Sequence, residues 1–168
     1  MTGTSNVAQS VISSSGSEQT QEFGAKLAGF LRSGDLVLIE GELGAGKTTF
    51  VQGLAAGLGV TEQVASPTFT LMRIYQCGPI GVDLGVERLL HVDLYRLDHL
   101  REVVDLGLLE LLDDAAVAVV EWGDAGAPVL GNDFLEVRID RSDDEAPSQR
   151  SISLAGGPSW SSRIPRAV

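Results

Sequence analysis

Residues 36–48, LVLIEGELGAGKT, decide the fold of this chain. The apolar run Leu36–Ile39 has no polar alternation and ends in turn residues, which predicts a short buried strand. The strand leads into a stretch that satisfies G-x-x-x-x-G-K-[ST] at every fixed position, namely Gly41-Glu42-Leu43-Gly44-Ala45-Gly46-Lys47-Thr48. An amphipathic helix follows, so the motif has the context that it requires. A plain glycine-rich turn is the alternative, and the flanking strand and helix disfavour it.

The spacing of this loop suits a polyphosphate ligand. Glycine lets the backbone approach a ligand without a Cβ in the way. Successive N–H groups, together with the positive end of the following helix, attract phosphate oxygens. We expect Lys47 to reach the β- and γ-phosphates and the Thr48 hydroxyl to ligate Mg²⁺. The sequence therefore predicts that the chain binds a nucleoside triphosphate.

Length and composition predict one globular domain in a reducing compartment. The chain has 168 residues, 43% of them hydrophobic, and no apolar run approaches the roughly 20 residues that cross a bilayer. The N-terminus has neither the basic start nor the apolar segment of a secretory signal. Cys77 is the only cysteine, which excludes an internal disulfide and any multi-cysteine metal site. We expect a cytoplasmic protein that does not act at a membrane.

The charge balance is acidic. Twelve Lys and Arg oppose 23 Asp and Glu, for a formal net charge of −11, and Lys26 and Lys47 are the only lysines. A protein that grips nucleic acid through its phosphates usually shows a basic face. Direct binding of DNA or RNA by this chain is therefore disfavoured.

Hydrophobic periodicity predicts alternating helices and strands. Helices are expected at 18–32, 47–58 and 98–113, with a break near 105–107, and strands at 36–39, 68–75, 88–96, 115–120, 134–139 and 151–154. The last two strands are expected to form an antiparallel edge hairpin. Gly53 and Gly57, inside the second helix, predict close packing of that helix on the sheet.

Three further ranges complete the predicted organisation. Residues 1–16 are expected to be flexible, with an edge strand at 7–12 as the alternative, and 17–155 to form the domain. Residues 76–86 carry turn signals and are expected to form the tip of a long hairpin. Residues 156–168 are expected to be an irregular tail.

Two strand ends carry candidate carboxylates. Asp93 lies at or near the end of the 88–96 strand, and Glu121 directly follows the apolar run 115–120. In phosphate-loop nucleoside triphosphatases such a carboxylate positions Mg²⁺ or the attacking water. Alternation puts His91 and Tyr95 on the same face as Asp93. The alternatives are a half-buried strand with a wet side and, for Glu121, a simple surface charge.

Hydroxyl and aromatic side chains provide the remaining candidates. Ser66, Thr68 and Thr70 follow the second helix, where many nucleotide hydrolases keep a loop that senses the γ-phosphate, and a Ser/Thr-rich turn is the alternative. Thr20, in the first turn of the first helix, either contacts the base or ribose or faces solvent. Trp122 is a core residue, a base contact or a partner contact.

Taken together, these motifs resemble the bacterial TsaE family. The shared elements are GELGAGKTT, SPTFTL before a strand, HVDLYRL, DLG and EW, in that order, from about Thr20 to Ile139. TsaE proteins are the ATPase component of the machinery that makes N6-threonylcarbamoyladenosine at position 37 of tRNAs. Very many families share the phosphate loop, whereas HVDLYRL together with EW is far more specific.

The resemblance implies a three-layer α/β/α fold of the P-loop NTPase kind, with a mixed parallel and antiparallel central sheet. It further implies bound ATP or ADP with Mg²⁺ and association with the TsaB–TsaD pair, in which TsaD performs the transfer. Contact with tRNA would be indirect, through that complex. TsaE would use ATP binding and hydrolysis to support repeated turnover.

The resemblance also assigns roles to residues. The segment from Gly44 through Lys47 and Thr48 to Thr49 would contact phosphates and metal, and Ser66 and Thr68 would sense the γ-phosphate. Asp93 and Glu121 would be the acidic pair, with the metal-holding and water-orienting roles left open between them. Trp122 would belong to the functional EW element, and Thr20 would lie near the adenine.

Two other classes of function remain as alternatives. Many small-molecule kinases are single phosphate-loop domains of this length, but they usually carry an arginine-bearing lid, and the arginines here are scattered. The second alternative is a nucleotide-gated binding module without meaningful catalysis.

Overall fold

The computed structural model describes residues 8–67, 71–112, 114–142 and 146–164. Its helices and strands are β1 Ala8–Ser14, α1 Ser17–Ala28, β2 Leu36–Glu40, α2 Lys47–Gly57, β3 Met72–Gln76, α3 Pro79–Asp83, β4 Arg88–Asp93, α4 Leu100–Asp105, α5 Leu108–Leu112, β5 Ala116–Glu121, β6 Leu135–Arg141 and β7 Arg150–Gly156. Short 3₁₀ turns lie at Gly123–Ala125, Ala127–Val129 and Pro158–Trp160. Within these described ranges, no helix has the length and apolar character to cross a membrane.

The strands form one mixed sheet in the order β1-β7-β6-β2-β5-β4-β3. β2 is parallel to both β5 and β6, and β4 is parallel to β5, whereas the outer pairs β1–β7, β6–β7 and β3–β4 are antiparallel. The mixed sheet is therefore confirmed, and so is the antiparallel β6–β7 hairpin, but the hairpin does not lie at the edge of the sheet because β1 pairs with β7. Because β2, β4 and β5 are parallel, their carboxyl ends meet at one edge of the sheet.

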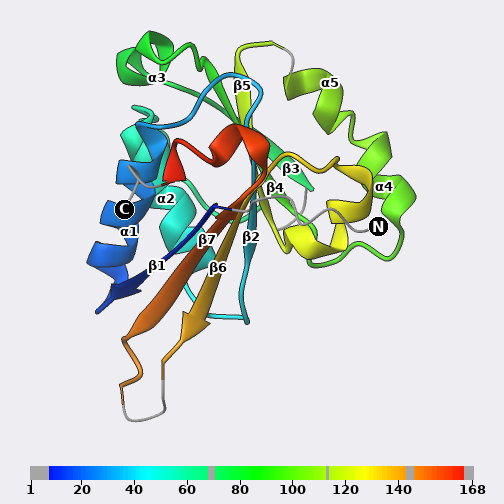
Figure 1. Cartoon of the computed structure of the whole chain (residues 1–168). Coiled ribbons are helices and arrows are strands. Elements are labelled where there is room, and N and C mark those ends of the chain that lie inside the picture. Colours follow the sequence, from blue (N-terminus) through cyan, green and yellow to red (C-terminus); the bar gives the residue numbers. More distant parts are fainter. Residues whose placement is uncertain (1–7, 68–70, 113, 143–145, 165–168) are drawn as a thin grey trace.

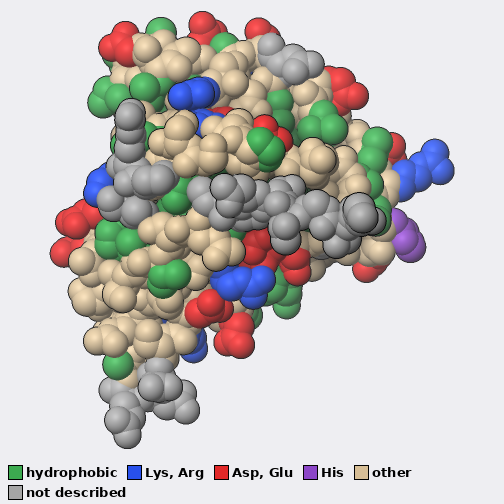
Figure 2. Space-filling model, in the orientation of Figure 1, with side chains coloured by type: hydrophobic (Ala, Val, Ile, Leu, Met, Phe, Trp, Pro, Cys, Tyr) green, Lys and Arg blue, Asp and Glu red, His purple; other side chains and the backbone are tan. Residues whose placement is uncertain are grey.

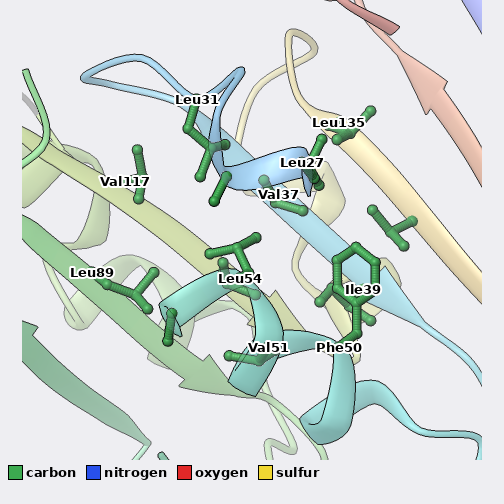
Figure 3. Close-up of a cluster of buried hydrophobic side chains, with 14 of the residues drawn as sticks. Leu27, Leu31, Val37, Ile39, Phe50, Val51, Leu54, Leu89, Val117 and Leu135 are labelled. Carbon is green, nitrogen blue, oxygen red and sulfur yellow. The ribbon is translucent and has the colours of Figure 1, made fainter. Parts of the chain in front are cut away.

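Helices cover both faces of this sheet, which gives the three layers that the family resemblance implies (Figure 1). On one face, Leu27 of α1 and Phe50 and Leu54 of α2 are buried against the central strands (Figure 3). On the other face, Val103 of α4 and Leu112 of α5 are buried in a second apolar cluster. The central strands are buried on both sides, which explains why their sequences are continuous apolar runs.

Glycines bring the backbones of α1 and α2 into contact. A Cβ at Gly53 would clash with the backbone of Gln21, and a Cβ at Gly24 would clash with the backbone of Phe50. Gly57 likewise leaves no room for a side chain against α1. The prediction that Gly53 and Gly57 pack on the sheet is therefore wrong, because they face a helix. This close contact fixes α2, whose first residues end the phosphate loop.

Both ends of the described chain are more ordered than the sequence predicts. β1 lies in the range expected to be flexible and pairs along its whole length with β7, so the alternative of an edge strand near residues 7–12 is correct. Beyond β7, Trp160 is fully buried and Arg163 forms a buried ion pair with Asp35. As far as residue 164 the tail has no strand or long helix, as predicted, but it is packed against the domain, while 1–7 and 165–168 lie outside the described residues.

The structure also tests two of the predicted connections between elements. β3 and β4 form the expected hairpin, but the residues between them contain helix α3 rather than a simple turn. Pro79 occupies the first position of α3, where proline is favoured because that position needs no N–H donor. The break predicted near 105–107 separates α4 from α5 as expected.

Candidate nucleotide-binding site

The phosphate loop joins β2 to α2 and depends on glycines with positive φ. Gly41, Gly44 and Gly46 have φ values of 152°, 77° and 105°, and Gly46 is the residue that precedes α2. A side chain is disfavoured in this backbone region, which explains the two fixed glycines of the motif, Gly41 and Gly46, and favours glycine at position 44 as well. The helix then starts at Lys47, which directs the first free N–H groups of α2 toward the loop.

Arginines from the β6–β7 hairpin hold the outer side of this loop. Arg150 Nε donates to the Ala45 carbonyl at 2.8 Å, and Arg141 Nη2 donates to the Gly44 carbonyl at 3.3 Å. These two bonds attach the loop to the hairpin, while within the loop the Ala45 amide donates to the Glu42 carbonyl at 3.0 Å. The sequence analysis missed both arginines, since nothing in their local pattern ties them to the loop.

Lys47 is buried at the start of α2. Its ammonium donates to the carbonyls of Gly41 and Glu42 at 2.7 and 2.8 Å and lies 4.0 Å from the ring centroid of Trp122. Burial lowers the pKa of Lys47 below its ordinary value of 10.5, although the nearby carboxylates of Glu121 and Asp93 act in the opposite direction. The negative charge of an incoming phosphate would strongly stabilise an ammonium that burial has stripped of water.

The two candidate carboxylates lie side by side at the carboxyl edge of the sheet. Asp93 and Glu121 are register partners on the parallel strands β4 and β5. The Thr48 hydroxyl donates to Glu121 Oε1 at 2.9 Å, and the Ser66 hydroxyl donates to Asp93 Oδ2 at 2.6 Å. The phosphate loop is thus joined to Glu121, and the segment after α2 is joined to Asp93.

His91 and Tyr95 of the HVDLYRL segment also contact the two carboxylates. His91 Nε2 lies 2.7 Å from Glu121 Oε2 in the buried interior, and the Tyr95 amide donates to Asp93 Oδ1 at 2.9 Å. The Tyr95 ring lies against Trp122, with 4.9 Å between ring centroids. Trp122 adopts a left-handed backbone conformation with φ of 59°, which is rare for a bulky residue.

These side chains line a cavity of about 330 Å³. Its walls are Leu43, Gly44, Gly46, Lys47, Thr48, Thr49, Ser66, Asp93, Glu121 and Trp122. The structure therefore brings together the predicted loop, the acidic pair and the tryptophan. Thr68 and Thr70 lie outside the described residues.

A second cavity of about 250 Å³ lies on the other side of the phosphate loop. It is bounded by Gly44–Gly46 and Thr49, by the start of α1 with Thr20, and by Ser148 and Arg150 of the β6–β7 hairpin. Thr20 is buried and its hydroxyl shares a 2.7 Å hydrogen bond with Ser14. Thr20 thus lies at a loop-side cavity and does not face solvent.

The donor groups of the first cavity suit a magnesium–nucleotide complex. Hydroxyl and carboxylate oxygens are the ligands that Mg²⁺ prefers, usually with substrate phosphates completing the coordination. Among the described residues, no cluster of three or more His, Cys, Asp or Glu side chains could hold a metal without such help. The chemistry of Thr48 with the adjacent carboxylates therefore fits a metal that arrives with phosphates.

The acidic character of the chain is visible on its surface. On the face that Figure 2 shows, the Lys and Arg side chains lie apart from one another, with acidic side chains between them. The described side chains on this face therefore form no continuous basic patch of the kind that grips nucleic acid.

Comparison with known proteins gives a consistent result. The family model described as "Threonylcarbamoyl adenosine biosynthesis protein TsaE" matches residues 14–152. The tRNA threonylcarbamoyladenosine biosynthesis protein TsaE of Streptomyces coelicolor is 45% identical over 143 residues, which cover 83% of this chain and 93% of that protein. The Bacillus subtilis protein of the same name is 40% identical over 128 residues, or 76% of this chain and 75% of that protein.

A solved structure supports the same relationship. The crystal structure of Bacillus subtilis YdiB matches with a TM-score of 0.75 at 32% sequence identity, covering 93% of this chain and 90% of that one. Fold, site geometry and sequence thus agree with the resemblance carried by the motifs. The chain belongs to the TsaE family of tRNA threonylcarbamoyladenosine biosynthesis proteins.

Proposed function

We propose that this chain binds ATP with Mg²⁺, hydrolyses it slowly when alone, and thereby supports turnover of a TsaB–TsaD complex in the cytoplasm. Membership of the TsaE family ties the chain to tRNA threonylcarbamoyladenosine biosynthesis. The observation that carries the proposal is the hydrogen bond from Thr48 of the phosphate loop to Glu121, beside the Asp93–Ser66 pair.

The position of each residue in the site indicates its role. The amides from Gly44 to Thr49 and the ammonium of Lys47 would bind the phosphates. Thr48 and Glu121, which already contact each other, would hold Mg²⁺, which neutralises charge on the phosphate oxygens when bound. Asp93 would orient the attacking water, because its partner is Ser66 of the segment expected to sense the γ-phosphate. The sequence leaves the choice between the two carboxylates open, and these contacts favour Glu121 for the metal and Asp93 for the water.

The second cavity would take the nucleoside half of ATP. It adjoins Thr49 and the phosphate loop, Thr20 and Arg150 also line it, and neither Asp93 nor Glu121 does. A ribose and base entering there would run from the α-phosphate toward the start of α1. Trp122, whose ring is tilted against Tyr95 and lies next to Lys47, would border the phosphates and not the base.

Hydrolysis would be coupled to a partner through the segment that contains Ser66. Ser66 bonds Asp93 at 2.6 Å and directly precedes residues 67–70. The γ-phosphate would order this segment in the ATP state, and its loss would release it. A preference of about 1–3 kcal/mol between the two states would change partner affinity 5–150-fold.

The net charge indicates what kind of partner fits. At −11, the chain repels a polyanion and attracts a protein complex with a basic face. TsaB–TsaD would therefore be the direct partner, and tRNA would be met only through that complex.

Phosphate release from ATP, measured with and without purified TsaB–TsaD, tests the activity. The proposal expects slow release by the chain alone and faster release with the complex. Transfer of the γ-phosphate to a small metabolite would instead indicate a kinase, and the absence of any release would indicate a nucleotide-gated binding module.

Titration of the chain into TsaB–TsaD, with ADP or with a non-hydrolysable ATP analogue, tests the coupling. The ATP-like state should bind at least fivefold more tightly. Equal affinity in the two states, or tight tRNA binding by this chain alone at physiological salt, would contradict the mechanism.

A further inference from the structure

His91 lies behind the carboxylate of Glu121, and the function proposed above gives it no role. Its side chain is fully buried, and its Nε2 atom lies 2.7 Å from Glu121 Oε2. His91 on β4 is the register partner of Val119 on β5, two residues before Glu121. Strand alternation therefore puts His91 and Glu121 on the same face of the sheet as diagonal neighbours.

The hydrogen bonds determine where the imidazole carries its proton. Nδ1 of His91 is buried, and no described group offers it a hydrogen bond. A proton on Nδ1 would be a buried donor without a partner, whereas a proton on Nε2 is donated to Glu121. The geometry therefore favours a hydrogen on Nε2 of His91, with Glu121 Oε2 as its acceptor.

Glu121 is consequently held at both of its oxygens. Oε2 accepts from His91, and Oε1 accepts from the Thr48 hydroxyl at 2.9 Å. Without the His91 bond, Oε2 would be a buried charged acceptor lacking a partner, and the carboxylate would be free to rotate away from Thr48. The bond thus keeps Oε1 on the side of the phosphate loop.

We propose that His91 is a positioning residue for the magnesium site. By anchoring Oε2, it orients Glu121 so that Oε1 meets the Thr48 hydroxyl, the pair that would hold Mg²⁺. This inference rests on the proposed function, because it concerns how tightly Mg²⁺ is held together with the nucleotide. It predicts a specific loss of magnesium dependence and not a general loss of nucleotide binding.

Three variants separate positioning from packing. His91→Leu removes the donor and fills a similar volume. His91→Gln places an amide N–H close to the position of Nε2, so it can still donate to Glu121, whereas His91→Asn places its amide near the position of Nδ1 and cannot reach. Gln and Asn are a matched pair, since both introduce an uncharged amide at the same buried place.

Calorimetric titration with ADP, with and without Mg²⁺, is the decisive measurement. For wild type, Mg²⁺ should strengthen ADP binding. His91→Leu and His91→Asn should reduce that strengthening about 10–100-fold, the usual effect of losing a group that orients a metal ligand. His91→Gln should restore most of it, and ADP affinity without Mg²⁺ should stay within about twofold of wild type in all three variants.

The outcomes distinguish this inference from the proposed function. If Mg²⁺ does not strengthen ADP binding to wild type, the proposed function itself fails. If wild type responds and His91→Leu responds equally, or if Gln and Asn behave alike, the positioning role fails while the proposed function stands. An equal loss of ADP affinity with and without Mg²⁺ would show that His91 only supports the fold.

Discussion

Thr48 and Glu121 are 73 residues apart in the sequence, and the Thr48 hydroxyl donates a 2.9 Å hydrogen bond to Glu121 Oε1. Thr48 is the second residue of α2 and Glu121 is the last residue of β5, so the bond joins the end of the phosphate loop to the carboxyl edge of the sheet. The register of Glu121 with Asp93 then extends the connection to β4 and, through Ser66, to the segment after α2. A change at any of these groups should alter either the binding of the magnesium–nucleotide complex or its turnover.

Lys47→Ala and Thr48→Ala should abolish the increase in melting temperature that Mg-ATP produces. Both side chains line the cavity at the start of α2, and a ligand at 100 times its Kd stabilises a protein by about 2.7 kcal/mol. Lys26→Ala is the matched control, because Lys26 is the only other lysine and is exposed on α1. A shift of wild-type size in either site variant would refute the phosphate-loop assignment.

Glu121→Gln and Asp93→Asn should have different effects. Glu121→Gln keeps the shape and removes the charge next to Thr48, so the Mg²⁺ concentration for half-maximal phosphate release should rise. Asp93→Asn should leave that concentration near the wild-type value and lower turnover about 10²–10⁴-fold, as for a lost positioning base. Phosphate release across a Mg²⁺ titration, with TsaB–TsaD present, measures both quantities. The opposite pattern would exchange the two roles.

Arg150→Gln should weaken ADP binding about tenfold, equivalent to ~1.4 kcal/mol. Arg150 donates to the Ala45 carbonyl and borders the second cavity, so its loss removes support for the loop and one wall of the nucleoside site. Arg138→Gln is the control on the same hairpin, since Arg138 pairs with Glu40 and Glu136 instead. Calorimetry should show less than twofold change for the control, and an equal change in both would point to a general charge effect.

The sequence predicts the central architecture because the physical signals there are local. The run Leu36–Ile39 and the run ending at Val120 are continuously apolar, as expected of strands buried on both faces. Once the strand that ends at Asp93 lies parallel to the run ending at Val120, Asp93 and Glu121 must emerge at the same edge. The phosphate loop follows the first run, so the principal site could be located from the order of the motifs alone.

Features that depend on distant contacts could not be predicted in this way. Gly53 signals a close approach, but the pattern does not say whether its neighbour is the sheet or α1. Arg150 lies 105 residues beyond Ala45, whose carbonyl it contacts. Ser148 and Thr20 likewise meet at one cavity only after folding. The tail after β7 is rich in Gly, Ser and Pro, which are turn signals whether or not neighbouring side chains are buried.

The last prediction concerns that tail. Arg163 makes a two-pronged ion pair with Asp35, at 2.6 and 3.0 Å, and donates to the Phe30 carbonyl at 3.0 Å. Its guanidinium also lies 3.6 Å from the ring centroid of the buried Trp160. These contacts attach the C-terminal tail to the loop between α1 and β2, beyond the residues that the family model matches.

Arg163→Met should therefore lower the free energy of unfolding by about 3–5 kcal/mol, since it leaves Asp35 as a buried charge without its partner. Adding Asp35→Asn should recover part of the loss, because the unpaired charge is then gone. Urea denaturation measures the three proteins, and Arg101→Met, which removes an exposed pair with Asp105, should leave the midpoint unchanged. If the urea midpoint of Arg163→Met equals that of the wild type, the tail contacts the domain without stabilising it.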